Sequence, residues 1–271
     1  MKKRWGIFCL IISSQGFALD EAPWFGNVYE FEFFTDFIYS QYSKIDHAVV
    51  QPSYAYNNYV TDVDLGLTLS ENIDVQWEIN LACTPHQPYS FRSSALQGRY
   101  LLWDDIAGDP LSIALGLNTR AVGGRSVRDV SSPYASYWNG EATLSVGKEF
   151  TKDTDWKTRG YLFASIGMAN HGSLWDRCKA SFEARIKDAH ALEMFGVGYF
   201  GYGQHKSVNI DAFQGWGRIW HGSVDLGAKY SYFFDLWGTV TLSYACRVLA
   251  YSYPEREQTV QFSYTLPFSF F

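Results

Sequence analysis

Apolar and polar residues alternate along most of this chain. In the clearest example, Ile73, Val75, Trp77, Ile79 and Leu81 alternate with Asp74, Gln76, Glu78 and Asn80. Because successive side chains of a β-strand point to opposite faces, this alternation predicts strands with one apolar and one polar face. It recurs near residues 28–40, 57–69, 72–83, 91–103, 111–121, 138–149, 158–169, 179–187, 190–203, 217–231, 238–251 and 258–270.

The connections between these predicted strands fall into two alternating sets. One set is long and comprises residues 41–56, 84–90, 122–137, 170–178, 204–216 and 252–257. The other is mostly shorter and comprises residues 70–71, 104–110, 150–157, 188–189 and 232–237. The sequence therefore predicts an all-β fold, a closed antiparallel transmembrane β-barrel of about twelve strands with short periplasmic turns and longer extracellular loops.

The last predicted strand lies within Gln258–Phe271 and is rich in aromatic residues. One face carries Val260, Phe262, Tyr264, Leu266, Phe268 and Phe270, and the other carries Thr259, Gln261, Ser263 and Thr265. The stretch ends on Phe271. It resembles the carboxy-terminal signal of bacterial outer-membrane β-barrel proteins. The resemblance implies that Gln258–Phe271 binds the barrel-assembly machinery and that the protein resides in the bacterial outer membrane.

The start of the chain has the features of a secretory signal peptide. Met1–Arg4 is positively charged, Trp5–Ile12 is apolar, and Gly16-Phe17-Ala18 places small residues before a cleavage point. We expect residues 1–18 to be a signal peptide and residues 19–271 to form one transmembrane barrel domain.

Composition excludes some classes of partner and favours others. Aromatic residues make up 18% of the chain, and the formal net charge is −6. Nucleic-acid binding proteins carry a basic surface, so we expect no nucleic-acid partner. Aromatic belts at both membrane interfaces are typical of barrels in the outer membrane, so we expect outer-membrane lipid to surround the protein.

Three cysteines, Cys83, Cys178 and Cys246, follow the predicted signal peptide. A bridge between Cys83 and Cys178 is one possible arrangement of this odd number of thiols.

The polar rows of the predicted strands are expected to line the barrel lumen. The acidic candidates come early in the chain and are Glu30, Glu32, Asp36, Asp62, Asp64, Asp74 and Glu78. The basic candidates follow and are Arg99, Arg120, Arg159, Arg185, Lys229 and Arg247. Two interpretations stay open: the charges line a water-filled, selective lumen, or they pair with one another and fill a barrel too narrow to conduct.

Other motifs suggest catalytic or ligand-binding sites. His171 and Ser173 share one strand face, and Asn170-His171-Gly172-Ser173 resembles the His-x-Ser of outer-membrane phospholipase A. That resemblance implies a His171 base and a Ser173 nucleophile, but Leu174-Trp175 replaces the family's Asn-Gly. A G-x-G-x-x-G run starts at Gly196 without a βαβ context. The histidines lack metal-ligand spacing, so we expect neither a metal nor a cofactor.

Three functions are compatible with these features. The leading hypothesis is a narrow channel, or porin, for small polar solutes. The alternative is a structural or surface-interaction barrel of the adhesin type, using residues of the 122–137 loop; these are Arg125, Arg128, Asp129, Tyr134, Tyr137 and Trp138. The third is a lipid-modifying barrel enzyme that uses His171 and Ser173.

Overall fold

The computed structural model describes residues 19–153, 156–234 and 237–269. The predicted signal peptide, residues 1–18, lies outside the described residues, as do Phe270 and Phe271 of the predicted carboxy-terminal signal.

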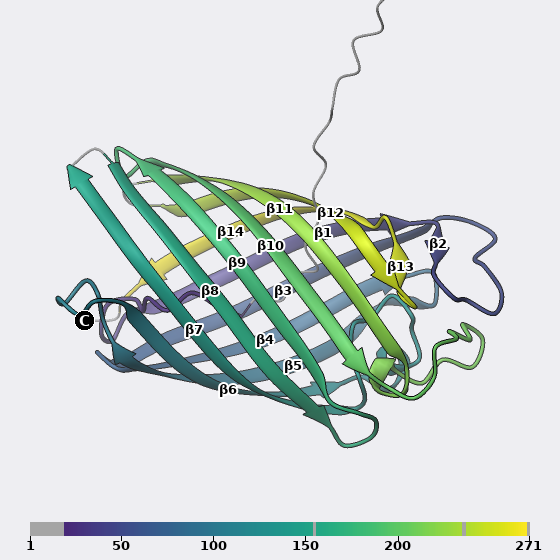
Figure 1. Ribbon diagram of the computed structural model, residues 1–271. Helices are drawn as coiled ribbons and strands as arrows, with labels where there is room; N and C mark the ends of the chain where they lie inside the picture. Colours follow the sequence, from purple (N-terminus) through teal and green to yellow (C-terminus); the bar gives the residue numbers. More distant parts are fainter. Residues whose placement is uncertain (1–18, 154–155, 235–236, 270–271) are drawn as a thin grey trace, which may run out of the picture.

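A closed barrel of antiparallel strands forms almost the whole molecule (Figure 1). Its strands are β1 (Phe31–Tyr42), β3 (Tyr56–Ser70), β4 (Ile73–Thr84), β5 (Gln87–Trp103), β6 (Ser112–Val122), β7 (Trp138–Asp153), β8 (Trp156–Ala169), β9 (Trp175–Ile186), β10 (His190–Tyr202), β11 (Trp220–Phe234), β12 (Gly238–Tyr251) and β14 (Gln258–Phe268). Neighbours in sequence pair in space, and β1 closes the barrel by pairing with both β3 and β14. The prediction of a closed antiparallel barrel of about twelve strands is confirmed.

The two ends of the barrel differ. At one end, which we call the short-turn end, the strands are joined by short turns such as residues 71–72 and 187–189. The other, the long-loop end, carries residues 43–55, 123–137 and 203–219. Short elements lie in these long loops and between β12 and β14: β2 (Lys44–Ile45) pairs with β13 (Pro254–Glu255), and α1 (Gly124–Val127) and η1 (Trp216–Arg218) are single turns. Neither helix of the described chain is long enough to cross a bilayer.

Several predicted strand boundaries were wrong by three or four residues. Residues 84–90 were expected to form a loop, but β4 and β5 continue through them to a turn at residues 85–86. The Thr84 hydroxyl accepts the amides of His86 and Gln87, both at 3.1 Å, which stabilises this tight turn. β9 begins at Trp175 rather than at residue 179. Its first outward positions are Asp176 and Cys178, so the apolar row that marks other strands is missing there.

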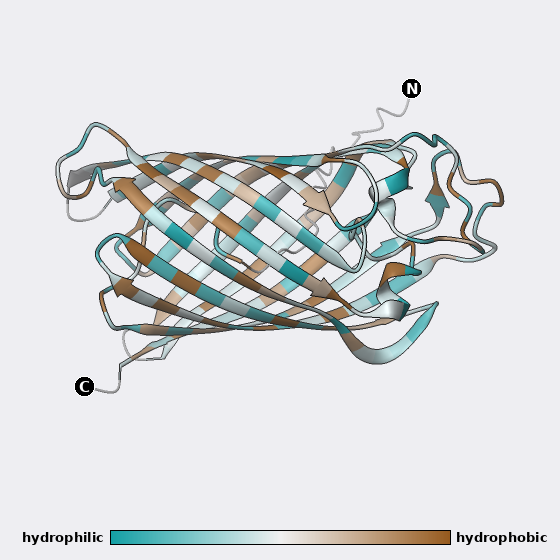
Figure 2. Ribbon diagram, turned by 90° about the horizontal axis from the view of Figure 1, so that it is seen from below, coloured by the Kyte–Doolittle hydropathy of each residue, from teal (hydrophilic) through white to brown (hydrophobic). Residues whose placement is uncertain are grey.

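The faces of the strands explain the alternation in the sequence. Outward side chains are apolar and exposed, as with Leu117 at 71% and Leu162 at 64% of their full accessibility. Inward side chains are polar and buried, as with Asp62 at 0% and Glu78 at 1%. Figure 2 shows brown and teal residues alternating along the strands. This inside-out distribution is the one expected of a barrel whose outer face meets lipid.

The structure also shows where the glycine run and the cysteines noted in the sequence lie. The G-x-G-x-x-G run lies inside β10, where a side chain at Gly198 would collide with Cys178 and Phe200. Cys83 and Cys178 are both free thiols, so the bridge between them that the sequence left open does not form in this structure.

The outward apolar row predicts a penalty for charge in mid-strand. Replacing Ile79 in β4 by Arg should cost about 2–4 kcal/mol in the free energy of unfolding, because the guanidinium would have to leave water. Urea unfolding of the protein in lipid vesicles, followed by tryptophan fluorescence, measures this. The matched control is Ile106→Arg in the turn 104–111, where the side chain is already 60% exposed and the change should stay within about 0.5 kcal/mol. Equal losses for both variants would contradict a lipid-facing β4.

Candidate functional site in the barrel lumen

The segment that precedes β1, residues 19–30, enters the lumen with residues 19–25, whereas residues 26–29 are exposed at the short-turn end. It turns back from the start of β1 at the short-turn end, where the Tyr29 amide donates to the Thr68 carbonyl at 2.8 Å. Further along, Trp24 Nε1 donates to Asp105 Oδ1 at 2.9 Å. Leu19 is 5% exposed. We call residues 19–30 the lumen segment.

Asp105 is the anchor of this segment at the short-turn end. Burial would raise the pKa of the Asp105 carboxyl, but hydrogen bonds from Ser112, the Glu149 amide and Trp24 outweigh it and hold the pKa below its usual value. A carboxylate with a lowered pKa stabilises the fold above its unfolded pKa of about 4, and this contribution is lost as the pH falls further. The contact between Asp105 and Trp24 is therefore intact at neutral pH.

Two acidic residues hold the inner part of the lumen segment against the barrel wall. Asp20 Oδ2 accepts from Arg99 Nη2 at 3.0 Å, and Arg99 Nη1 also reaches the Ala22 carbonyl at 2.7 Å. Glu21 binds Arg177 at 2.5 Å and Lys179 at 3.0 Å. The lumen segment thus neutralises cations of β5 and β9 from inside the barrel.

Further buried ion pairs join strands that are neighbours or next-nearest neighbours in the barrel, and one reaches Glu257 before β14. Arg99 binds Asp74 at 2.7 Å, Arg177 binds Glu141 at 3.1 Å, and Arg120 is in short contact with Glu78. Arg247 binds both Asp225 and Glu257 at 2.8 Å. Each of these arginines is 6% exposed or less. Because a buried charge that loses its partner is costly, each of these arginines depends on the carboxylate beside it.

Several inward acids of β1 and β3 have no cation within ion-pair distance among the described residues. Asp36 accepts from Gln261 Nε2 at 2.8 Å, and Asp62 accepts from Asn80. Both carboxylate oxygens of Asp64 are buried without a hydrogen-bond partner in the described chain. The acidic excess expected of the first strands is therefore concentrated on β1 and β3.

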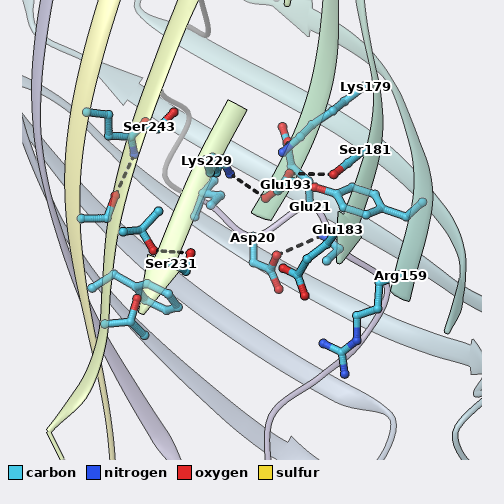
Figure 3. Close-up of a pocket in the computed structure, with 18 of the residues that line it drawn as sticks. Asp20, Glu21, Arg159, Lys179, Ser181, Glu183, Glu193, Lys229, Ser231 and Ser243 are labelled. Carbon is cyan, nitrogen blue, oxygen red and sulfur yellow. Dashed lines mark hydrogen bonds and ion pairs between the residues drawn. The ribbon is translucent and has the colours of Figure 1, made fainter. Parts of the chain in front are cut away.

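A polar cavity of about 290 Å³ occupies the other side of the lumen segment. Its lining includes Asp20 and Glu21 of that segment, Arg159 of β8 and Lys179 of β9. Ser231 of β11 and Ser243 of β12 face them. Figure 3 shows these two serines on one side, Lys179 and Arg159 on the other, and Asp20 and Glu21 between them. The lumen is thus filled along β4–β7 and hollow along β8–β12, β14 and β1.

The long-loop end is closed by loops that fold into the barrel. Trp216, fully buried, donates from Nε1 to the Ser132 carbonyl at 2.8 Å and packs against the tilted Tyr253 ring with ring centroids 4.4 Å apart. The Tyr199 hydroxyl donates to the Pro133 carbonyl at 3.1 Å. These contacts join the 123–137 and 203–219 loops in an apolar cluster. We call this cluster the loop cap.

The structure places the residues selected from the sequence in three groups. Arg159 and Lys229 line the cavity together with Asp36. Asp62, Asp64, Asp74, Glu78, Arg99, Arg120 and Arg247 are buried on the inner face. The remaining three residues lie near the short-turn end. Glu30 accepts a hydrogen bond from Asn27, and Glu32 packs beside Gly66. Arg185 binds Glu183 at 3.4 Å and lies over the Phe233 ring at 4.2 Å.

Several charged residues of this site were not predicted from the sequence. Asp20 and Glu21 lie in a stretch without alternation, and nothing in that stretch indicates that it enters the lumen. Arg177 was missed because β9 was expected to start after it. Lys179 and Glu193 do sit on inward rows of β9 and β10, and a correct β9 boundary would have placed Arg177 in the same row as Lys179.

The motif at His171 and Ser173 lies in the turn that follows β8. The Ser173 amide donates to the Gly217 carbonyl at 2.6 Å, and no hydrogen bond joins the His171 ring to the Ser173 hydroxyl among the described contacts. The resemblance to phospholipase A is not confirmed.

Two buried carboxylates provide a test of the ion-pair arrangement. Asp225 and Asp64 are both 3% exposed, but only Asp225 has a cation beside it. Asp225→Asn should lower the free energy of unfolding by about 3 kcal/mol, because Arg247 loses a buried partner. Asp64→Asn should leave stability within about 1 kcal/mol or raise it, because an unpaired buried charge is removed. Urea unfolding in micelles measures the free energy of unfolding of each variant. Equal losses would contradict the assignment of Asp225 as paired and Asp64 as unpaired.

Comparison with known proteins supports the fold. No family model matches the chain, and no curated protein matches it in sequence. The COG4313 outer membrane channel from Pseudomonas putida F1 is similar in structure with a TM-score of 0.68 at 10% identity, over 92% of this chain and 100% of the channel. The KdgM porin has a TM-score of 0.51 at 9% identity, over 85% and 98% of the two chains. The NanC porin has a TM-score of 0.51 at 10% identity, over 86% and 98%. The chain has the fold of bacterial outer-membrane β-barrels.

Proposed function

We propose that the protein is an outer-membrane channel for small polar solutes. The observation that carries this proposal is the polar cavity beside the lumen segment, inside a barrel whose outer face is apolar. A barrel that served only as a scaffold would gain stability from a packed interior, whereas this one keeps a hollow lined with hydroxyl and charged groups. The fold it shares with the COG4313 channel and the KdgM porin agrees with this function.

The orientation in the membrane follows the usual plan of such barrels. The long-loop end faces the cell exterior and the short-turn end faces the periplasm. Export depends on the signal peptide at residues 1–18, and insertion depends on recognition of Gln258–Phe271 by the barrel-assembly machinery. Outer-membrane lipid surrounds the apolar face.

The lumen-lining charges have different roles in this channel. Arg159 and Lys229 face the path of the solute, whereas Arg99, Arg120 and Arg247 hold the wall together through buried ion pairs.

The loop cap closes the long-loop end in this structure. A solute can enter from outside only when the 123–137 and 203–219 loops separate.

The surface-interaction alternative loses part of its support. Asp129 and Tyr134 of the 122–137 loop were expected to meet a partner protein, but they are 1% and 5% exposed. Asp129 accepts from the Thr84 hydroxyl at 2.6 Å, and Tyr134 shares a hydrogen bond with Ser93 at 2.9 Å. Both residues close the barrel instead of presenting a surface.

The lumen segment gives the sharpest test of the channel. In the double variant Asp20→Asn with Glu21→Gln, Arg99, Arg177 and Lys179 lose their carboxylate partners on the segment. Current through the refolded protein in a planar bilayer should rise, because the segment is held less firmly, and selectivity should move toward anions. The shift should fade as salt rises, because charges act over about 8–10 Å at moderate salt.

The control for this test is Asp109→Asn, which makes the same chemical change in the turn 104–111. It should leave current and selectivity unchanged. If the wild type, the double variant and a variant lacking residues 19–26 all carry no current, the channel proposal is wrong.

A further inference from the structure

The cavity wall formed by β11, β12 and β14 carries hydroxyl and amide groups and a single charged residue, Lys229. These groups belong to Ser231, Thr241, Ser243, Gln261, Ser263 and Thr265. Ser243 is 1% exposed, and its hydroxyl is buried without a hydrogen-bond partner in the described chain. Buried polar groups are almost always hydrogen-bonded, so an unpartnered hydroxyl on a cavity wall indicates a place for a polar ligand or water. We call this surface the hydroxyl wall.

The cations that face the cavity are already neutralised. Lys179 binds Glu21 at 3.0 Å, Lys229 binds Glu193 at 3.5 Å, and Arg159 binds Glu149 at 2.7 Å. A carboxylate or phosphate ligand would have to displace one of these partners before it could bind. Asp36 adds a negative charge whose hydrogen-bond partner is the neutral Gln261 amide. The cavity therefore disfavours anions.

Aromatic side chains complete the lining. Trp24 of the lumen segment, Phe34 of β1 and Tyr161 of β8 all border the cavity, and the Trp24 and Tyr161 rings meet edge to face at 6.1 Å. Aromatic rings provide apolar surface for the carbon–hydrogen faces of a ligand, while serine and threonine bind its hydroxyl groups. This combination suits a molecule that has apolar faces and hydroxyl edges.

From this lining we infer that the cavity is a binding site for a neutral, polyhydroxylated solute, a sugar of one or two rings. Its volume of about 290 Å³ is near the lower limit of known ligand sites, which excludes long oligosaccharides. The lumen segment forms one side of the site and the hydroxyl wall the other. The inference names the solute class of the proposed channel and rests on that function for its biological meaning. The binding itself can be measured without transport.

Saturation-transfer NMR on the refolded protein tests binding directly, in a detergent without a sugar headgroup. Glucose is the neutral probe, and glucuronate is the matched anion with the same ring. We expect saturation transfer to glucose and about tenfold weaker binding of glucuronate, because the anion has no free cation to meet. Equal binding of both probes, or binding of glucuronate alone, would overturn the inference.

Variants locate the bound sugar. Thr241→Val with Ser243→Val removes two hydroxyl groups from β12 and should weaken glucose binding about tenfold, from the loss of hydrogen bonds. The control is Thr119→Val, which makes the same change at an outward, exposed position of β6. Heat-modifiable migration on a gel shows that each variant is folded. A folded double variant that binds glucose as well as wild type would refute the site.

A liposome-swelling assay separates this inference from the proposed function. Glucose binding without glucose uptake would support the site and refute transport by this barrel. Uptake of glucose without saturation transfer would support the channel and refute the site. Uptake and binding that both fall in the double variant would support the two together.

Discussion

Closure of the barrel by backbone hydrogen bonds is the constraint on which the rest of the structure depends. In lipid, no water satisfies an exposed amide or carbonyl, so a spanning sheet can have no free edge. Here β1 meets β14 from Phe31 opposite Phe268 to Gln41 opposite Gln258, which joins the beginning of the chain to its end. Each further feature follows from this closed cylinder: an apolar outside, a polar inside and connections confined to two ends.

A polar interior creates a second requirement, because its charges are removed from bulk water. The structure meets it with pairs between neighbouring or nearby strands, such as Asp225 on β11 with Arg247 on β12. Where the strands supply too few anions, the lumen segment supplies two more, at Asp20 and Glu21. The same pairs that make a filled interior tolerable also leave the cavity without free cations. Stability and the proposed preference for neutral solutes would then have one physical origin.

The sequence predicted the parts of the structure that follow from local alternation. The row from Ile73 to Leu81 identified β4 and its inward acids, because a period of two fixes both the strand and its faces. Contacts between distant residues carry no such pattern. Glu21 meets Arg177 across 156 positions, and Trp216 meets Ser132 across 84. The lumen segment, the loop cap and therefore the shape of the cavity could not be predicted from the sequence.

The covalent link between the lumen segment and β1 makes its binding an intramolecular event. A tethered ligand acts at an effective concentration in the millimolar range, set by the length of the link and not by how much protein is present. A solute that enters the cavity does not have to displace the segment, because the cavity lies between the segment and the hydroxyl wall. The tether therefore keeps one side of the cavity in place in every molecule, at any external concentration of solute.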